Sequence, residues 1–135
     1  MTLAKDIMTT KIISIKPETS VIAAIDLLLE HRISGLPVVD DQMHLSGILS
    51  EKDLLNILFQ KDVNVNTPVE RFMSKKVLKF DVNASAIDIC DFFLNHAVRR
   101  VPIVQDDKLV GIVSRRDALK LVLSTVLSLG NKNAD

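Results

Sequence analysis

The chain of 135 residues carries 17 Lys and Arg against 17 Asp and Glu, so its formal net charge is zero. This balance disfavours proteins that hold nucleic acid through its phosphates, and a hydrophobic content of 47% excludes an intrinsically disordered chain. The single cysteine, the lack of a visible apolar leader and apolar runs of about five residues, where a spanning helix needs about 20, predict a soluble cytoplasmic protein with no membrane segment.

The two halves of the chain repeat one sequence pattern at a spacing of 65 residues. Identical pairs at this spacing include Met8 with Met73, Ser20 with Ser85, His31 with His96 and Pro37 with Pro102. One residue is lost near Met43, after which the spacing is 64 and the pairs include Gly47 with Gly111, Ser50 with Ser114 and Asp53 with Asp117. Such an ordered series indicates an internal duplication of a unit of about 50 to 60 residues.

The first half predicts a strand, a helix, a hairpin and a second helix. A β-branched run at 12–15 predicts the first strand. A helix with Thr19 or Ser20 as its cap follows, because apolar residues recur at helical spacing: Val21, Ile22, Ile25, Leu28 and Leu29. Residues 36–39 and 45–49 predict a hairpin around the polar turn 40–44, and residues 51–59 predict the second helix.

The second half predicts the same order of elements. A strand at 77–80 precedes a helix that Ser85 caps, with an apolar stripe of Ile87, Cys90, Phe93 and Leu94. Residues 101–104 and 109–113 predict a hairpin around the turn 105–108, and a last helix runs from 115 to about 129. Each half therefore predicts the order β-α-β-β-α.

These elements predict an α+β (mixed α/β) fold. Strands such as 36–39 are apolar on both sides, a pattern typical of a sheet that is covered on both faces. We therefore expect two pseudo-symmetric repeats packed sheet to sheet in one compact body. The expected boundaries are 1–60 for the first repeat, 61–68 for a polar linker that ends in Pro68, 69–130 for the second repeat and 131–135 for a flexible tail.

The first candidate site segment is the end of each hairpin, at 47–53 and 111–117. A Ser at the strand end is followed three residues later by an Asp, as Ser50 by Asp53 and Ser114 by Asp117. One interpretation is a capping pair that satisfies the first backbone N–H groups of the helix. The other is a carboxylate that accepts hydrogen bonds from two ribose hydroxyls, with backbone N–H groups near an anion. Both hold if the cap also faces a ligand.

The second candidate segment is the turn into the middle strand, at 33–37 and 98–102. Pro37 and Pro102 lack a backbone donor, so the strand is an edge or is irregular there. Neighbouring backbone groups are then free for a partner such as the edge of an adenine ring. A plain edge strand is the alternative interpretation.

Taken together, these segments resemble a tandem CBS-domain protein, known as a Bateman module. The resemblance rests on 6–9, 31–40 and 47–53 with their counterparts in the second half, and covers roughly residues 1–125. It implies a stand-alone regulatory module that binds AMP, ADP, ATP or S-adenosylmethionine in clefts between the repeats. It also implies no catalysis, no required cofactor, a homodimer, and a regulated partner protein that the sequence does not identify.

The resemblance assigns nine residues to each of two ligand sites. One site joins Lys11, Ile13, Ile33, Ser34, Gly35 and Pro37 to Ser114, Arg116 and Asp117. The other joins Lys76, Leu78, Val98, Arg99, Arg100 and Pro102 to Ser50, Lys52 and Asp53. By resemblance, Ile13 or Leu78 contacts adenine together with the Pro turn, Asp117 or Asp53 holds the ribose, and the Arg and Lys residues meet phosphate. Arg99 and Arg100 favour the site of Asp53 for a di- or triphosphate, because guanidinium groups bind phosphate in a bidentate way.

The charge and the remaining reactive residues leave other interpretations open. Residues 1–65 carry 6 Lys and Arg and 9 Asp and Glu, net −3, whereas residues 66–135 carry 11 and 8, net +3. This difference is either ordinary surface variation or a basic half that gathers phosphate. His31, His44 and His96 lack the spacing of metal ligands, and Cys90 is expected in a core rather than as a nucleophile.

A rival function is a ligand-independent homodimerisation or scaffold module, in which the Ser and Asp pairs are only caps. An enzyme with an unrecognised site is a weaker third option. The stretch 119–129 is apolar around more than one face, which predicts a buried helix whose partner is a second copy of the chain.

Overall fold

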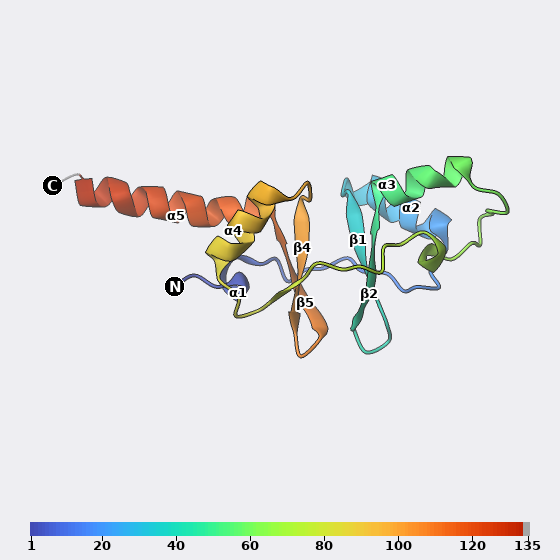
Figure 1. Cartoon of the computed structure of the whole chain (residues 1–135), viewed down its shortest axis with the longest axis horizontal. Coiled ribbons are helices and arrows are strands. Elements are labelled where there is room, and N and C mark those ends of the chain that lie inside the picture. The colour runs from blue at the N-terminus through green and yellow to red at the C-terminus, as the bar shows by residue number, and fades with distance from the viewer. Residues whose placement is uncertain (134–135) are drawn as a thin grey trace. The chain divides into compact units, whose positions relative to one another are not determined.

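The computed structural model describes residues 1–133, the last three of them by their backbone alone, and divides into two compact units. The first-repeat unit comprises Ile13–Val77 with residues 107–109. The second-repeat unit comprises Met1–Ile12, Leu78–Asp106 and the chain from Val110 onward. Each unit contains helices and strands, which confirms the mixed fold class (Figure 1). No helix among the described residues is both long and apolar enough to cross a membrane.

The first-repeat unit is built around a hairpin. Its elements are α2 (Val21–His31), β1 (Gly35–Val39), β2 (Leu45–Ser50), α3 (Glu51–Leu55) and the 3-10 segments η1 (Asn56–Phe59) and η2 (Val69–Arg71). The strands β1 and β2 are antiparallel, with Gly35 opposite Ser50 and Pro37 opposite Ile48. This register places the start of β1 beside the end of β2, and therefore beside the first turn of α3.

The second-repeat unit has the same plan with one more strand. Its elements are α1 (Ala4–Ile7), β3 (Phe80–Asp81), α4 (Ala86–Asn95), β4 (Arg100–Gln105), β5 (Lys108–Ser114) and α5 (Arg115–Asn133). The strands lie in the order β3-β4-β5, with β3 parallel to β4. Asp106 and Asp107 form the tight turn between β4 and β5, both with positive φ of 51° and 65°, as a two-residue hairpin turn of this twist requires.

Each unit also contains the segment that precedes the other repeat in the sequence. In the second-repeat unit, Leu3 bridges to Ser85 and Thr9 to Ile112. The equivalent residues in the first-repeat unit form the equivalent bridges, Pro68 to Ser20 and Ser74 to Ile48. The short helix α1, which the sequence pattern did not predict, belongs to this arrangement. The lead segments, residues 1–12 before the first repeat and residues 66–77 before the second, therefore each complete the other repeat.

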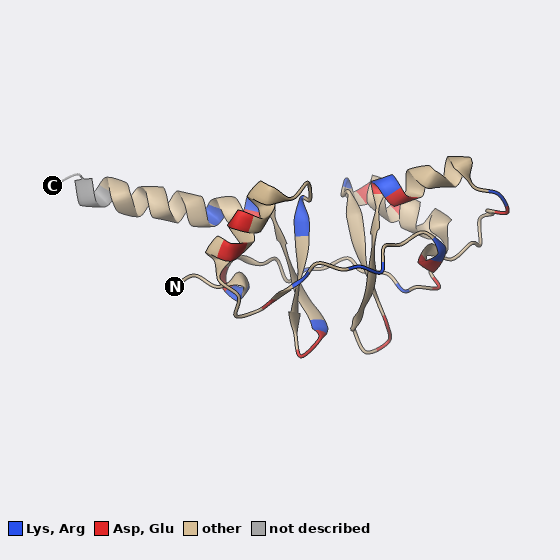
Figure 2. Ribbon diagram, viewed as in Figure 1, with Lys and Arg blue, Asp and Glu red and all other residues tan. Residues whose placement is uncertain are grey.

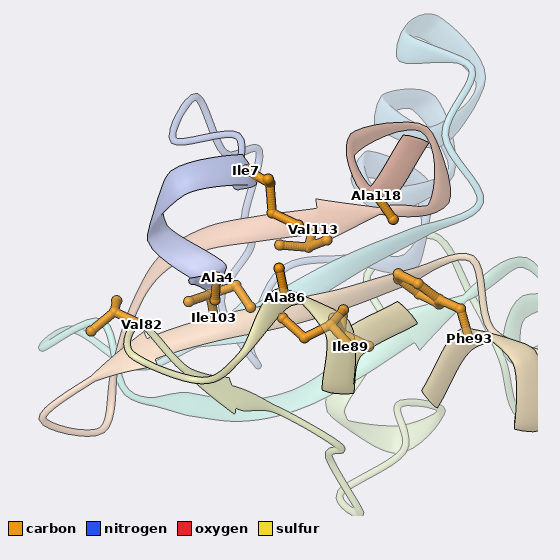
Figure 3. Packing of buried hydrophobic residues seen from close by; sticks show 10 residues of the cluster. Ala4, Ile7, Val82, Ala86, Ile89, Phe93, Ile103, Val113 and Ala118 are labelled. Carbon is orange, nitrogen blue, oxygen red and sulfur yellow. The ribbon is translucent and has the colours of Figure 1, made fainter. Parts of the chain in front are cut away.

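Two hydrophobic cores hold the units. Figure 3 shows the core of the second-repeat unit, where Ala4 and Ile7 of α1 and Ala86 and Ile89 of α4 pack together with residues of the sheet such as Ile103 and Val113. The first-repeat core is made of Ile15, Val21, Ala24, Leu28, Leu36, Val38, Leu49 and Val69. Val69, from the lead segment of the second repeat, is fully buried in this core. Burial of apolar surface is the main force that fixes both lead segments in place.

Several predicted elements differ in extent. The strand expected at 12–15 is reduced to an isolated parallel bridge between Ile15 and Val38, and the strand expected at 77–80 is Phe80–Asp81. The helix expected at 51–59 is α-helical only to Leu55 and continues as the 3-10 segment η1. The last helix extends to Asn133, so it includes Gly130 and the first residues of the expected tail, while residues 134–135 lie outside the described residues.

The helix caps are only partly as predicted. Ser20 is the N-cap of α2, and its hydroxyl accepts a hydrogen bond from the backbone N–H of Ala23 at 3.2 Å. Ser85 occupies the N-cap of α4, but its side chain makes no capping hydrogen bond. The backbone N–H of Ala86 instead donates to the carbonyl of Thr2 at 3.0 Å, so the lead segment satisfies this helix start.

The buried faces of the helices are a further correction. Leu29 is 72% exposed on α2 and Leu94 is 85% exposed on α4, although both belong to the predicted apolar stripes. The buried positions are Val21, Ala24 and Leu28 on α2, and Ala86, Ile89 and Phe93 on α4. Small alanines therefore face the core, and part of the large apolar set, including Ile22 and Ile87, is exposed.

In the single chain the helix α5 is largely exposed, and its predicted burial against a second copy stays a prediction. It packs on its unit through Asp117, Ala118 and Leu121. Beyond them it exposes Leu119, Val122, Leu123, Val126, Leu127 and Leu129, each between 48% and 61%.

Candidate functional site

The head of α3 carries a complete capping box. The hydroxyl of Ser50 accepts a hydrogen bond from the backbone N–H of Asp53 at 3.1 Å, and Oδ2 of Asp53 accepts from the backbone N–H of Ser50 at 2.9 Å. Within residues 1–133, no group donates a hydrogen bond to Oδ1 of Asp53. The capping interpretation is therefore confirmed for this pair, and one carboxylate oxygen remains open to a ligand.

The head of α5 has the same capping box in different surroundings. Ser114 and Asp117 exchange the same two hydrogen bonds, at 3.1 Å and 2.9 Å. In addition, Oγ1 of Thr9 donates to the Asp117 carboxylate at 3.2 and 3.3 Å, and Nζ of Lys120 donates to its Oδ1 at 3.1 Å. Asp117 is 7% exposed, and it is the one buried charged residue of the described chain. Both of its oxygens are already in use.

The electrostatics of Asp117 follow from these contacts. Burial raises the pKa of this carboxyl, but the backbone N–H of Ser114 and the ammonium of Lys120 outweigh it, so the pKa lies below its usual value. The carboxylate is therefore ionised at neutral pH and balanced by Lys120. Sequence analysis missed both Thr9 and Lys120 as partners, although Lys120 follows Asp117 by three residues, a spacing at which helical side chains meet.

The turn into the middle strand lies beside the helix head in each unit. The backbone N–H of Glu51 donates to the carbonyl of Ser34 at 2.9 Å, and that of Arg115 donates to the carbonyl of Arg99 at 3.0 Å. The Arg115 guanidinium adds a bond to the carbonyl of Val98 at 3.0 Å. The structure therefore brings the two candidate segments of each repeat together.

The proline strand is less open than expected. Pro37 and Pro102 are buried, and the carbonyl of Pro37 accepts a hydrogen bond from the backbone N–H of Ile15 at 3.1 Å. The backbone N–H of Val39 donates to the carbonyl of Ile15 at 2.8 Å. These neighbours of Pro37 are consequently not free for adenine, because residue 15 occupies that edge of β1.

Charge separates the two repeats at this end of the sheet. Arg99 directly precedes β4, Arg100 begins it, and Arg115 and Arg116 begin α5; all four are exposed. The equivalent positions of the first repeat hold Ser34, Gly35, Glu51 and Lys52. Figure 2 shows the start of β4 in blue, whereas the turn between β4 and β5 is red and is followed by the blue start of β5, so the turn carries both charges and the opposite end is basic. The basic end suits a phosphate group.

The remaining predicted site residues are divided between the units. Lys11 and Leu78 belong to the second-repeat unit, and Ile13 and Lys76 to the first-repeat unit. Ile13 packs against the first-repeat core, whereas the other three are exposed. The assignment of residues from both repeats to one site stays a prediction.

Other reactive groups offer no second centre. Within residues 1–133 no three His, Cys, Asp or Glu residues are grouped to hold a metal ion. Cys90 is half-buried against the second-repeat core, and burial raises the pKa of its thiol, so it is a poor nucleophile. The imidazole of His96, at the C-cap of α4, stacks on Phe92 and contacts the carbonyl of that residue at 3.0 Å.

Comparisons of the sequence and of the structure with known proteins both find CBS-domain proteins. The CBS domain family model matches residues 4–60 and 69–124. The chain is 32% identical to the CBS domain-containing protein YhcV of Bacillus subtilis, over 87% of this chain and 83% of that protein. The structure of CBSX2 in complex with AMP is similar with a TM-score of 0.81 and 31% identity, covering 93% of this chain and 98% of that one. The CBS domain pair of MJ0100, in complex with 5'-methylthioadenosine and S-adenosyl-L-methionine, is similar with a TM-score of 0.77 and 27% identity over 93% and 98% of the two chains.

Proposed function

The chain belongs to the CBS-domain family, and on that premise we propose that it is a regulatory module that binds an adenosine ligand and is not an enzyme. The observation that carries the proposal is the open Oδ1 of Asp53, at the head of α3, in a chain whose solved relatives bind AMP or S-adenosyl-L-methionine. A carboxylate oxygen with no donor is suited to the hydroxyls of a ribose.

We assign the ligand contacts by chemistry. Asp53 and Ser50 hold the ribose, and Arg99 and Arg100, both exposed, meet the phosphates. The proposed contacts of this site are completed by Lys52, Lys76, Leu78, Val98 and Pro102. The other set that the resemblance implies is Lys11, Ile13, Ile33, Ser34, Gly35, Pro37, Ser114, Arg116 and Asp117, in which the Asp117 carboxylate already contacts Thr9 and Lys120. AMP, ADP, ATP and S-adenosylmethionine are the candidate ligands.

The proposed mechanism is a shift between two arrangements of the module. A ligand that binds one arrangement more tightly than the other raises the population of the tighter-binding arrangement. The size of that shift is set by the ratio of the two affinities. A partner protein or the assembly of the chain then responds to the new population. No bond is made or broken in this scheme, which is why Ser50 and Ser114 need no base.

The proposed assembly is a homodimer through the helices that follow the second strand of each hairpin. Leu55, Leu58 and Phe59 are between 63% and 84% exposed, and their equivalents at a spacing of 64 residues, Leu119, Val122 and Leu123, are also exposed. Exposed apolar sets of this kind mark interaction surfaces. Sedimentation of the chain at micromolar concentration is expected to give a dimer. A monomer with and without nucleotide would contradict this assembly.

An absorption spectrum of the purified chain tests the ligand. The chain contains no Trp and no Tyr, so protein absorbs very little at 280 nm and bound adenine dominates near 260 nm. We expect denaturation to release an adenosine compound that mass spectrometry identifies, or titration with AMP, ADP, ATP or S-adenosylmethionine to raise the thermal midpoint. A clean spectrum together with no thermal shift from any of the four would favour the ligand-independent scaffold instead.

A further inference from the structure

The two capping boxes are not equivalent, and the difference bears on how many ligands one chain binds. We infer that the chain has one adenosine site, built on Asp53, because Thr9 and Lys120 occupy the Asp117 carboxylate that a second site would need. This inference rests on the proposed function and specifies the occupancy of its sites.

A ribose diol presents two O–H donors, so it needs two free acceptor positions on a carboxylate. An ionised carboxylate offers about four such positions on its two oxygens. At Asp117, Oδ2 accepts from the Ser114 backbone at 2.9 Å and lies 3.3 Å from Oγ1 of Thr9. Oδ1 lies 3.2 Å from the same Oγ1 and accepts from Lys120 at 3.1 Å. A ribose diol bound here would therefore have to displace at least one of these two side chains.

The Asp53 carboxylate, by contrast, has enough free acceptor positions for both hydroxyls of the ribose. Oδ2 accepts only from the Ser50 backbone at 2.9 Å, and within the described residues Oδ1 accepts from none. Position 56, three residues after Asp53, is an exposed Asn where the second repeat has Lys120. Ser74, the counterpart of Thr9, lies 3.5 Å from the carbonyl of Lys76 and makes no bond to Asp53. Two substitutions between the repeats therefore explain why one carboxylate is open.

Burial adds to the difference. The Asp117 side chain is 10% exposed, whereas Asp53 is partly exposed. The Lys120 side chain is 63% exposed, so its contact with Asp117 alone would oppose a ligand only weakly. The hydrogen bond from Thr9 and the burial of the Asp117 carboxylate oppose the ligand as well. Loss of even one hydrogen bond to a charged group would weaken a ligand at this position by at least about tenfold.

Calorimetric titration with 5'-methylthioadenosine tests the inference. This probe has the ribose diol but no phosphate. A variant that adds or removes a lysine therefore does not change its binding through attraction to a phosphate, only through the carboxylate that holds the diol. The wild-type chain is expected to bind one equivalent. The Thr9→Val/Lys120→Met variant removes both side-chain donors from Asp117 and is expected to bind a second equivalent.

The reciprocal variant Asn56→Lys places a lysine three residues after Asp53. It is expected to weaken the single wild-type site about tenfold. Circular dichroism of each variant verifies folding, and Asn56→Lys remains a test if the double variant does not fold. Two equal sites in the wild-type chain, or one unchanged site in both variants, would overturn the inference alone. No binding of the probe, of AMP or of ATP to any form would overturn the proposed function, and the inference with it.

Discussion

The heads of α3 and α5 show how one local pattern acquires two different properties. Ser50 with Asp53, and Ser114 with Asp117, form the same capping box with the same distances. Only Asp117 is buried and held by a threonine 108 residues away and by a lysine one turn later. Local sequence therefore determines the geometry of the cap, while packing against distant residues determines whether its carboxylate is available to a ligand.

The largest expected effect comes from the glycines on which the lead segments pack. A Cβ added at Gly47 would lie 2.7 Å from the backbone oxygen of Ser74, and two backbone hydrogen bonds between Ser74 and Ile48 hold that oxygen in place. At Gly111 the nearest atoms belong to the Met8 side chain, which can rotate. We expect Gly47→Ala to lower the free energy of unfolding by about 1–3 kcal/mol and Gly111→Ala by less, measured by urea denaturation followed by circular dichroism. Equal losses would show that the two lead segments are held alike.

Removal of each capping hydroxyl tests whether the two capping boxes contribute equally to stability. Ser50→Ala and Ser114→Ala each remove one hydrogen bond to the helix start, and each is expected to cost about 1 kcal/mol of unfolding free energy. Because the two boxes have the same distances, the two losses should agree within error. A loss at one serine only would refute the equivalence of the caps.

A smaller effect tests the distant contact. Thr9→Val keeps the side-chain shape and removes the donor to Asp117, so we expect a loss of about 0.5–1.5 kcal/mol in the same denaturation measurement. Ser74→Ala is the matched control in the other repeat, where the hydroxyl does not reach Asp53, and should change stability by less than about 0.5 kcal/mol. A larger effect at Ser74 would contradict the assignment of Thr9.

The smallest effect is a dependence of stability on pH. The pKa of Asp117 is lowered in the folded chain, so its contribution is present above the unfolded pKa of about 3.9 and is lost as pH falls through the folded pKa. Lys120→Met raises that pKa towards its usual value. The variant should be less stable than wild type at neutral pH, and the difference should vanish in acid. A difference that persists at low pH would mean that Lys120 acts through packing instead.

Sequence reasoning succeeded where the signal is local. Both hairpins and the Ser and Asp capping boxes follow from residues within a few positions of one another, as Ser114 and Asp117 illustrate. The duplication follows from the same local patterns recurring 64 or 65 residues later. The turn predicted at 105–108 is confirmed, and the structure narrows it to Asp106 and Asp107, while the one-residue difference near Met43 follows from the sequence alone.

The failures have two physical causes. Helical spacing alone did not separate the buried face from a second apolar face, so Leu29 and Leu94 were expected inside although small alanines occupy the core. The exchange of lead segments depends on packing between residues far apart in sequence, and no local pattern contains it. Thr9 was therefore missed at Asp117, whereas Lys120 was accessible from its spacing of three residues.

Carbon-13 nuclear magnetic resonance of the aspartate carboxyl groups tests the central claim most directly. The spectrum of the wild-type chain would be recorded during titration with AMP, with Asp53→Asn and Asp117→Asn used to assign the two signals. The account predicts that the Asp53 signal shifts in step with ligand occupancy while the Asp117 signal stays in place. A shift at Asp117 with none at Asp53 would contradict it, and no shift at either carboxyl would contradict ribose binding by the capping boxes altogether.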